Sequence, residues 1–249
     1  MMLRIISVCV AACLFASPAA AQELEGDYLY RVETIRAAPG KLEALLEWAA
    51  RAREDNYFED AGGSFPLIMR HSQGDQWDLL VILPMESWVD FHTKARQKKR
   101  QDATRKHEIL LASQDGLIAF EEDHFAYGPP YNEVKSAYDS NAYFHIEMFN
   151  AAPGKSGELL EQRRMENAYL EQTGQTPNMI FRRAAGSDVD IFTIGFHESR
   201  LSYASQAPHD EEAAEDIAKD VGFKDRADIS FYLRSLISGH HDTFAVKVE

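Results

Sequence analysis

Residues 30–47 read YRVETIRAAPGKLEALLE, and residues 144–161 read FHIEMFNAAPGKSGELLE. The box AAPGK at 37–41 returns at 151–155, and the triplet LLE at 45–47 returns at 159–161 in the same register. Each copy joins an alternating apolar run, a Pro-Gly turn and a run with helical spacing, which predicts a strand–turn–helix unit. A self-similarity of this kind indicates that the chain contains an internal duplication.

Hydrophobic patterning around the two copies predicts the same βαββαβ order in each half, which is the order of ferredoxin-like domains. In the first half a helix follows Gly40, and Ser87 with Asp90 predicts the capped start of a second helix. The expected strands are 28–35, 65–70, 77–83 and 117–127 in the first half, and 143–149, 179–183, 189–196 and 243–246 in the second. A helix is expected over 158–171. Residues 22–127 therefore form the first repeat, 128–141 a linker, and 142–249 the second repeat.

A four-stranded sheet with helices on one face leaves its other face uncovered. Large exposed apolar faces are rare on soluble proteins, so this face must be buried. Two copies in one chain can cover each other. The sequence therefore predicts an α+β fold in which two tandem ferredoxin-like repeats pack sheet to sheet as a pseudo-dimeric α/β barrel.

The N-terminal segment has the pattern of a signal peptide. Arg4 precedes an apolar run over 5–16, and the small residues of 17–21 form a cleavage site, with cleavage expected after Ala21. The mature protein is then periplasmic or secreted. Lipid attachment at Cys13 is the less favoured alternative, because the apolar run continues past this residue. Both cysteines, Cys9 and Cys13, lie in this segment, so the mature chain would carry no thiol.

The charge balance excludes some partners. The chain has 26 Lys and Arg against 40 Asp and Glu, a net charge of −14, which repels nucleic acid and anionic membrane surfaces. No second long apolar run is present, so membrane insertion is not expected.

Corresponding segments of the two halves carry opposite charge. The basic set in segment 94–106 is Lys94, Arg96, Lys98, Lys99, Arg100, Arg105 and Lys106; the acidic set in segment 210–220 is Asp210, Glu211, Glu212, Glu215, Asp216 and Asp220. One interpretation is two solvated helix faces. The other is mutual attraction, within the chain or between chains of a homo-oligomer.

The order of these motifs resembles a known superfamily. A strand, a Pro-Gly-Lys turn, a helix, and a later strand ending in a Glu-Ser pair (residues 86–87 and 198–199) are similar to the dimeric α/β-barrel proteins. The antibiotic-biosynthesis-monooxygenase-like and NIPSNAP-like branches are the most similar, over residues 28–127 and 142–248. The resemblance implies the barrel fold and a wide set of activities: cofactor-free monooxygenases, haem-degrading and haem peroxidase-like enzymes, isomerases, and members without known activity. Haem-degrading relatives use an Asn on the first strand, and neither first strand here has one before Asn150.

Alternation along the two first strands sorts their side chains into two faces. The set expected to face the helices is Tyr30, Val32 and Thr34 with Phe144, Ile146 and Met148; the set expected between the sheets is Arg31, Glu33 and Ile35 with His145, Glu147 and Phe149. Glu33, His145 and Glu147 are the catalytic candidates, because an enclosed carboxylate and imidazole can act as acid and base. The alternative is a structural ion pair between Arg31 and one glutamate, with His145 hydrogen-bonded nearby.

Aromatic side chains near these strands predict an apolar pocket. The ligand-binding candidates are Arg31, Tyr30, Trp77 and Phe149, and the expected partner is a small apolar or aromatic molecule. Three functions fit: a cofactor-independent monooxygenase or isomerase, a haem- or metal-binding protein using His145, and a non-catalytic binding or assembly module. No cofactor and no metal site is predicted, with haem at His145 as the alternative.

His240 and His241 are expected in a loop before the last strand, where at most one of them could join a site.

Overall fold

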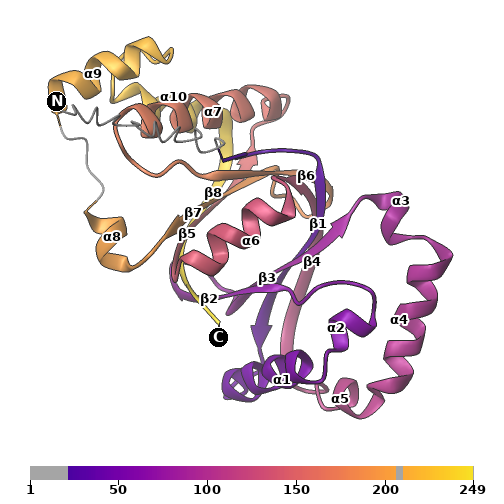
Figure 1. Ribbon diagram of the computed structural model, residues 1–249. Helices are drawn as coiled ribbons and strands as arrows, with labels where there is room; N and C mark the ends of the chain where they lie inside the picture. Colours follow the sequence, from indigo (N-terminus) through magenta and orange to yellow (C-terminus); the bar gives the residue numbers. More distant parts are fainter. Residues whose placement is uncertain (1–21, 206–209, 249) are drawn as a thin grey trace, which may run out of the picture.

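The computed structural model describes residues 22–205 and 210–248, so the expected signal peptide and its cleavage site lie outside the described residues. The chain forms one closed eight-stranded antiparallel barrel (Figure 1). Its strands are β1 (Tyr28–Ala37), β2 (Leu67–Gln73), β3 (Leu79–Glu86), β4 (Ile118–Gly128), β5 (Tyr143–Ala151), β6 (Met179–Gly186), β7 (Ile191–His197) and β8 (Ile237–Lys247). They are ordered β1-β3-β2-β8-β5-β7-β6-β4, and β4 pairs back to β1.

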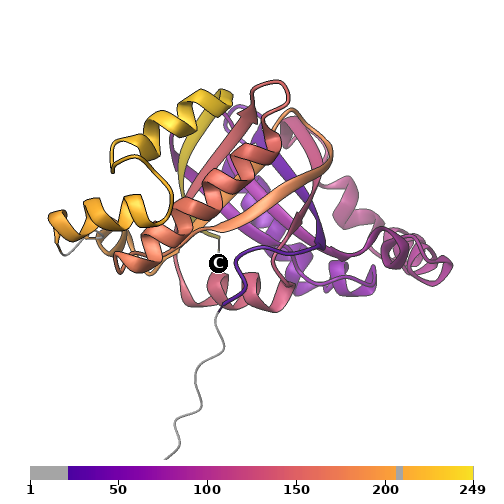
Figure 2. The same ribbon diagram turned by 90° about the horizontal axis from the view of Figure 1, so that it is seen from above.

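Helices cover the outside of the barrel in two groups, one for each repeat, with the strands between them (Figure 2). The first group is α1 (Leu42–Glu54), α2 (Tyr57–Asp60), α3 (Trp88–Phe91), α4 (Lys94–Lys106) and α5 (Glu108–Ala112); the second is α7 (Ser156–Gln172), α8 (Arg200–Ala204), α9 (Glu211–Asp220) and α10 (Asp228–Leu236). Within residues 22–205 and 210–248, none of the helices has the length and apolar character needed to cross a membrane.

The repeated sequence box forms the same structure twice. Gly40 and Gly154 adopt φ of 73° and 78°, a region that glycine enters without steric cost, and each turns the chain from a strand into a helix. A carboxylate of the neighbouring hairpin fixes each turn: Asp78 accepts a hydrogen bond from the backbone N–H of Ala37 at 2.8 Å. In the second half Asp190 accepts from the N–H of Ala151, also at 2.8 Å.

Two strand pairs join the halves into one sheet. β2 pairs with β8, and β4 pairs with β6, both antiparallel. The two four-stranded sheets are thus covered by each other and also hydrogen-bonded along both edges, which leaves no free edge strand in the barrel. This confirms the α+β fold and the pseudo-dimeric α/β barrel predicted from the duplication. The predicted cap is present too, because Ser87 Oγ accepts from the N–H of Asp90 at 3.1 Å.

Apolar side chains fill the interior of the barrel. Because these side chains were expected to face the helices, the sequence-based assignment of the two strand faces was wrong. The buried interior includes Tyr30, Val32, Met69, Leu80, Ile82, Phe144, Ile146, Phe181, Phe192 and Ile194. Tyr30 and Val32 were expected to face the helices, and Arg31 and Glu33 to lie between the sheets. In the structure Tyr30 and Val32 lie between the sheets, and Arg31 and Glu33 face the helices. The space between the sheets is enclosed by strands on all sides, so the apolar side chains of each strand are buried there. The helix–sheet layers open to solvent at their edges and therefore tolerate the polar set.

A helix that the sequence analysis did not predict lies in the segment expected to be a linker. α6 (Tyr131–Ser140) packs across one end of the barrel between the two halves (Figure 1). Val134 is fully buried, and Tyr138 donates a hydrogen bond to the carbonyl of Ile68 at 2.7 Å. The Tyr138 ring also stacks on Phe144, with centroids 5.5 Å apart. The connection is therefore part of the core.

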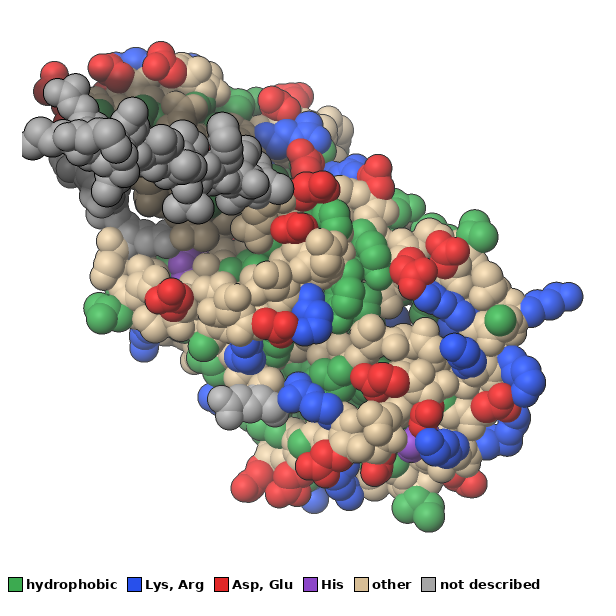
Figure 3. Space-filling model, in the orientation of Figure 1, with side chains coloured by type: hydrophobic (Ala, Val, Ile, Leu, Met, Phe, Trp, Pro, Cys, Tyr) green, Lys and Arg blue, Asp and Glu red, His purple; other side chains and the backbone are tan. Residues whose placement is uncertain are grey.

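The oppositely charged segments lie at opposite ends of the molecule. Lys and Arg side chains gather over α4 at one end, whereas α9 carries its acids at the other (Figure 3). Attraction between them within one chain is therefore excluded by their positions. Contact between neighbouring chains remains a hypothesis.

Candidate functional site

The first half contains a cavity of about 380 Å³ between the outer face of β1 and β3 and the helices α1, α2, α4 and α5. Its apolar wall is formed by Ile35, Leu45, Trp48, Ala49, Phe58, Ile68, Leu79, Val81, Leu83 and Leu111. Its polar lining includes Arg31, Glu33, Tyr57, Arg96, Arg100 and Gln114. An apolar pocket with a few converging polar groups is the usual form of a small-molecule site.

The sequence of α1 explains why this layer is not filled. Leu45, Trp48, Ala49 and Ala52 form the buried stripe of the helix, and two of these four are small. Trp48 is held in place at the cavity wall because its indole N–H donates to the carbonyl of Leu110 at 2.9 Å. The small side chain of Ala49 then leaves open space between α1 and the sheet.

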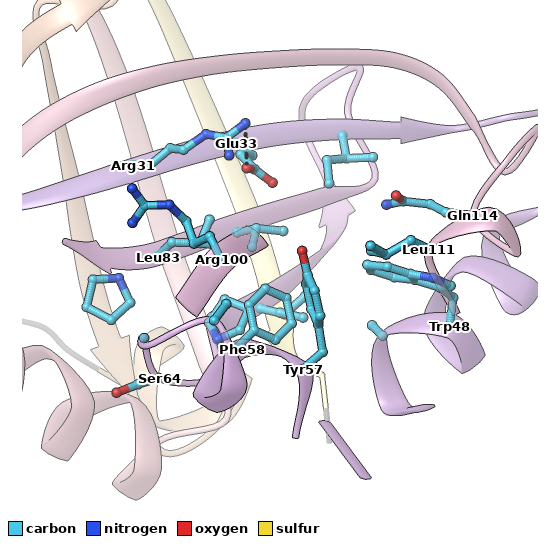
Figure 4. A pocket seen from close by; sticks show the side chains of 18 of the residues that line it. Arg31, Glu33, Trp48, Tyr57, Phe58, Ser64, Leu83, Arg100, Leu111 and Gln114 are labelled. Atoms are coloured by element: carbon cyan, nitrogen blue, oxygen red, sulfur yellow. Dashed lines mark ion pairs between the residues drawn. The ribbon is translucent and has the colours of Figure 1, made fainter. Parts of the chain in front are cut away.

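Glu33 contributes a mostly buried carboxyl group to the cavity lining. Its side chain is 12% exposed and lies 3.0 Å from the guanidinium of Arg31 (Figure 4). Arg31 in turn donates from Nε to Asp123 at 2.7 Å. Burial raises the pKa of the Glu33 carboxyl to about 7; Arg31 opposes this shift, and the charges of Glu121 and Asp123 add to it.

Tyr57 lies across the cavity from this ion pair, with its hydroxyl directed toward the side where Arg31 and Glu33 lie (Figure 4). Burial and the charge of Glu33 raise the pKa of the Tyr57 hydroxyl. It therefore stays protonated at neutral pH and can donate a hydrogen bond to a ligand.

In the equivalent layer of the second half, a cluster of charged side chains lies between α7 and the sheet. Arg163 on α7 is 2% exposed and places Nη1 3.5 Å from Glu147, and it also pairs with Glu166. Its guanidinium lies over the ring of Phe149, 4.7 Å from the centroid. Burial raises the pKa of the Glu166 carboxyl, and the charge of Glu147 adds to this shift against the effect of Arg163.

His145 and its neighbours complete this cluster. His145 Nε2 lies 2.7 Å from Asp242 Oδ1, and His240 Nε2 lies 3.3 Å from Glu147 Oε1. Burial opposes protonation of His145, but the hydrogen bond to Asp242 and the charge of Glu147 outweigh it and raise its pKa. His240 and His241 lie in β8, so their expected loop position was wrong. They do point to opposite faces, because His241 lies 3.6 Å from Asp75 at one end of the barrel.

The structure divides the predicted site residues among three places. Arg31 and Glu33 line the first-half cavity, as an ion pair of the kind foreseen in the structural alternative. His145, Glu147 and Phe149 lie in the second helix–sheet layer, and Tyr30 and Trp77 lie in the barrel interior. Tyr30 donates there to the carbonyl of Pro129 at 2.7 Å. The expected single site, with its ligand between the sheets, is therefore wrong in its location.

Sequence reasoning missed Tyr57 and Arg163. Tyr57 is the first residue of α2 and follows Asn56, whose φ of 58° is unusual outside glycine, and no pattern in the sequence marks this tyrosine. Arg163 could have been found, because it falls on the apolar stripe of α7 at the position that Ala49 occupies in the first copy. A charge on such a stripe predicts a buried partner.

The surroundings of His145 do not fit haem. An axial histidine must present a free ring nitrogen to iron in a slot wide enough for the macrocycle. Here the cavity beside the imidazole has a volume of about 350 Å³, and its polar walls, which include Glu147, Glu166 and Asn178, do not suit a large apolar macrocycle.

No family model and no curated protein matches the sequence. Among solved structures, the chain is similar to an anthrone oxidase-like protein, with a TM-score of 0.52 and 13% identity over 91% of this chain and 94% of that one. A chlorite dismutase mutant from Candidatus Nitrospira defluvii aligns with a TM-score of 0.47 and 10% identity, covering 92% and 96% of the two chains. A haem-binding protein from Thermus thermophilus aligns with a TM-score of 0.44 and 13% identity, covering 90% and 93%.

The chain has the fold of the dimeric α/β-barrel superfamily. Both repeats of that fold are present here in one polypeptide.

Proposed function

We propose that the first half binds a small apolar or aromatic molecule in its helix–sheet cavity and that Glu33 removes a proton from it. One observation carries this proposal: a carboxyl group whose burial raises its pKa to about 7 lines a cavity of about 380 Å³ with a largely apolar wall. A base is most effective when its pKa lies near the working pH.

The neighbours of Glu33 have complementary roles. Removal of a proton from a carbon whose anion is conjugated with a carbonyl, or from a phenol, leaves an anion on the ligand. The guanidinium of Arg31, 3.0 Å from Glu33, and that of Arg100 in the same cavity can stabilise this charge. The protonated Tyr57 hydroxyl can donate to the ligand oxygen.

The anion has two fates that need no bound cofactor. If the proton returns to a different atom, the reaction is an isomerisation. If the carbanion reacts with dioxygen, a peroxide forms and loses water, so that a CH₂ group and O₂ give a C=O group and H₂O. The likeness to an anthrone oxidase-like protein supports the choice of anthrone, a tricyclic ketone with an acidic CH₂ group, as the first probe.

The test is exchange of the anthrone CH₂ protons with deuterium under anaerobic conditions, followed by oxygen consumption on admission of air. We expect Glu33→Gln to lower the exchange rate by about 10²- to 10⁴-fold, the usual contribution of a general base. Glu147→Gln, at the corresponding position of the second half, should leave exchange unchanged. Binding without exchange would instead indicate the non-catalytic binding module. Equal rates for wild type and Glu33→Gln would contradict the role of Glu33.

We also propose that the protein is exported, and the signal-peptide pattern of residues 1–21 supports this. The mass of the protein recovered from the periplasm or the medium should correspond to a chain that begins at Gln22. An intact N-terminus with all activity in the cytosol would contradict export, and a lipid adduct on Cys13 would support the lipoprotein alternative.

A further inference from the structure

Two neighbouring strands of the second half bring metal-binding side chains together beneath α7. His145 and Glu147 come from β5, Asp242 comes from β8, and Glu147 and Asp242 are directly opposite each other in the strand register. One ligand atom from each of these three residues lies within 4.8 Å of the other two. Two carboxylates in facing positions of neighbouring strands repel each other unless a cation lies between them.

The first half has the same arrangement with different chemistry. Glu33 is opposite Asp123 in the β1–β4 register, and Arg31 holds Asp123 at 2.7 Å, the distance that separates His145 from Asp242 in the second half. A guanidinium is always charged and has no lone pair to offer, so it can neutralise carboxylates but cannot bind a metal. An imidazole at the same place can do either.

We propose that the second half binds one divalent transition-metal ion through His145, Glu147 and Asp242. One imidazole nitrogen with two carboxylates suits Zn²⁺, Mn²⁺, Fe²⁺ or Co²⁺ better than the all-oxygen preferences of Ca²⁺ and Mg²⁺. Ligand atoms about 2.0–2.2 Å from a metal are about 3–4 Å apart. The ion would replace the 2.7 Å hydrogen bond between His145 and Asp242, which requires side-chain movements of only about 1 Å, because the three ligand atoms already lie within 4.8 Å of one another.

The surrounding charges favour a cation at this position. The cluster holds three carboxylates: Glu147 and Glu166 pair with the guanidinium of Arg163, and Asp242 pairs with the imidazole of His145. Arg163 and the Thr193 hydroxyl both contact Oε2 of Glu147. The other oxygen, Oε1, has only a long contact of 3.3 Å with His240 and is the Glu147 oxygen that could bind the ion.

The site would be open rather than closed. His145 and Glu147 also line a cavity of about 350 Å³ together with Tyr203 and His197. Three protein ligands leave at least one coordination position for water or a small oxygen donor, as in catalytic metal sites and unlike structural ones. This inference does not rest on the proposed function, because the two sites belong to different halves.

The test is metal binding by protein purified in a chelator, with Zn²⁺ followed by titration calorimetry and Co²⁺ by its visible absorption. We expect one equivalent to bind and to raise the thermal midpoint. His145→Arg, which recreates the first-half ion pair, and Asp242→Asn should each weaken binding by about 100-fold or more, since even indirect partners of a metal ligand cost 10–100-fold. Both should abolish the Co²⁺ bands.

Asp123→Asn in the first half is the matched control and should bind as wild type does. If the arginine variant fails to fold, His145→Gln provides the same test. Absence of binding to the wild type, or binding that survives both His145→Gln and Asp242→Asn, overturns the proposal; the latter result would place the ion elsewhere, for example on His241. Exchange chemistry at Glu33 should be unaffected in the His145 and Asp242 variants, so failure here is distinguishable from failure of the proposed function.

Discussion

The two helix–sheet layers of this protein have one backbone plan and opposite contents. At the α1 positions of Trp48 and Ala49, the equivalent turn of α7 carries Gln162 and Arg163. The first layer consequently has a partly apolar cavity lined by one carboxyl group of raised pKa, whereas the second has a network of buried charges beside a cavity with polar walls. Two helix positions therefore account for much of the difference between an apolar and a charged layer in this fold.

The largest loss of stability is expected when Arg163, the buried cation of the second helix–sheet layer, is replaced. Arg163→Met leaves Glu147 and Glu166 without their guanidinium, and removal of one partner from a buried ion pair costs about 3–5 kcal/mol. Urea denaturation should show this loss. Arg164→Ala, at an exposed neighbour paired with Glu25, should cost less than about 1 kcal/mol. A loss as small for Arg163 as for Arg164 would show that the cluster is not needed for stability.

The second prediction compares the two glutamates by pH. Burial raises the pKa of Glu33 from 4.5 to about 7, so between these two pH values the folded protein keeps a proton on Glu33 that the unfolded chain releases. Its contribution to stability is full below pH 4.5 and is lost as the pH rises through 7, a change on the order of 3 kcal/mol. Burial opposes ionisation of Glu147, but the hydrogen bond from His240 and the charges of Arg163 and His145 outweigh it and lower its pKa. Its contribution is present above pH 4.5 and is lost as the pH falls.

The difference in unfolding free energy between wild type and Glu33→Gln should therefore decrease from pH 5 to pH 8. The corresponding difference for Glu147→Gln should decrease toward acid. Parallel pH profiles for the two variants would contradict the contrast between the layers.

The third prediction concerns a substitution that fills part of the first-half cavity. Ala49→Leu should occupy part of the cavity, stabilise the protein by about 0.5–2 kcal/mol and prevent ligand binding. Ala52→Leu is the control, because Ala52 is fully buried and does not line the cavity. It should destabilise the protein by about 1–3 kcal/mol through overpacking. Thermal unfolding measures both, and equal losses would show that the space beside Ala49 does not persist in solution.

The smallest effect concerns the charged ends. If the basic end at α4 contacts the acidic end at α9 of another chain, self-association should weaken when salt rises from 0.05 to 0.5 M, because exposed pairs of this kind contribute at most about 1 kcal/mol each. Sedimentation velocity checks this. A Lys98→Glu and Lys99→Glu double variant should be more monomeric than wild type at low salt. A monomer at all salt concentrations would mean that both ends are simply solvated.

The duplicated box was sufficient to predict the barrel, because a repeated strand–turn–helix unit with one uncovered sheet face has few ways to bury that face. The assignment of faces failed at Arg31 and Glu33. The polar side chains were expected between the sheets, but that space is closed to solvent and lined by buried apolar residues. The helix–sheet layers reach solvent at their edges and therefore accommodate polar groups.

The candidate site was predicted only in part for the same reason. Glu33 and Arg31 follow from strand alternation, but Tyr57 lies on a short helix whose position depends on tertiary contacts. α6 was missed because Pro129 and Pro130 indicated a linker. Tyr131, Val134 and Tyr138 are spaced as the buried face of a helix, and that spacing was the available signal.

The helix α6 has a further consequence, because it ties the two repeats into one polypeptide. In a barrel assembled from two identical chains, symmetry forces every substitution to occur in both subunits at once. Here each layer can change alone, and dilution cannot separate the partners. Covalent fusion therefore explains how one ancestral module could diverge into an empty pocket on one side and an ionic cluster on the other without either change compromising its twin.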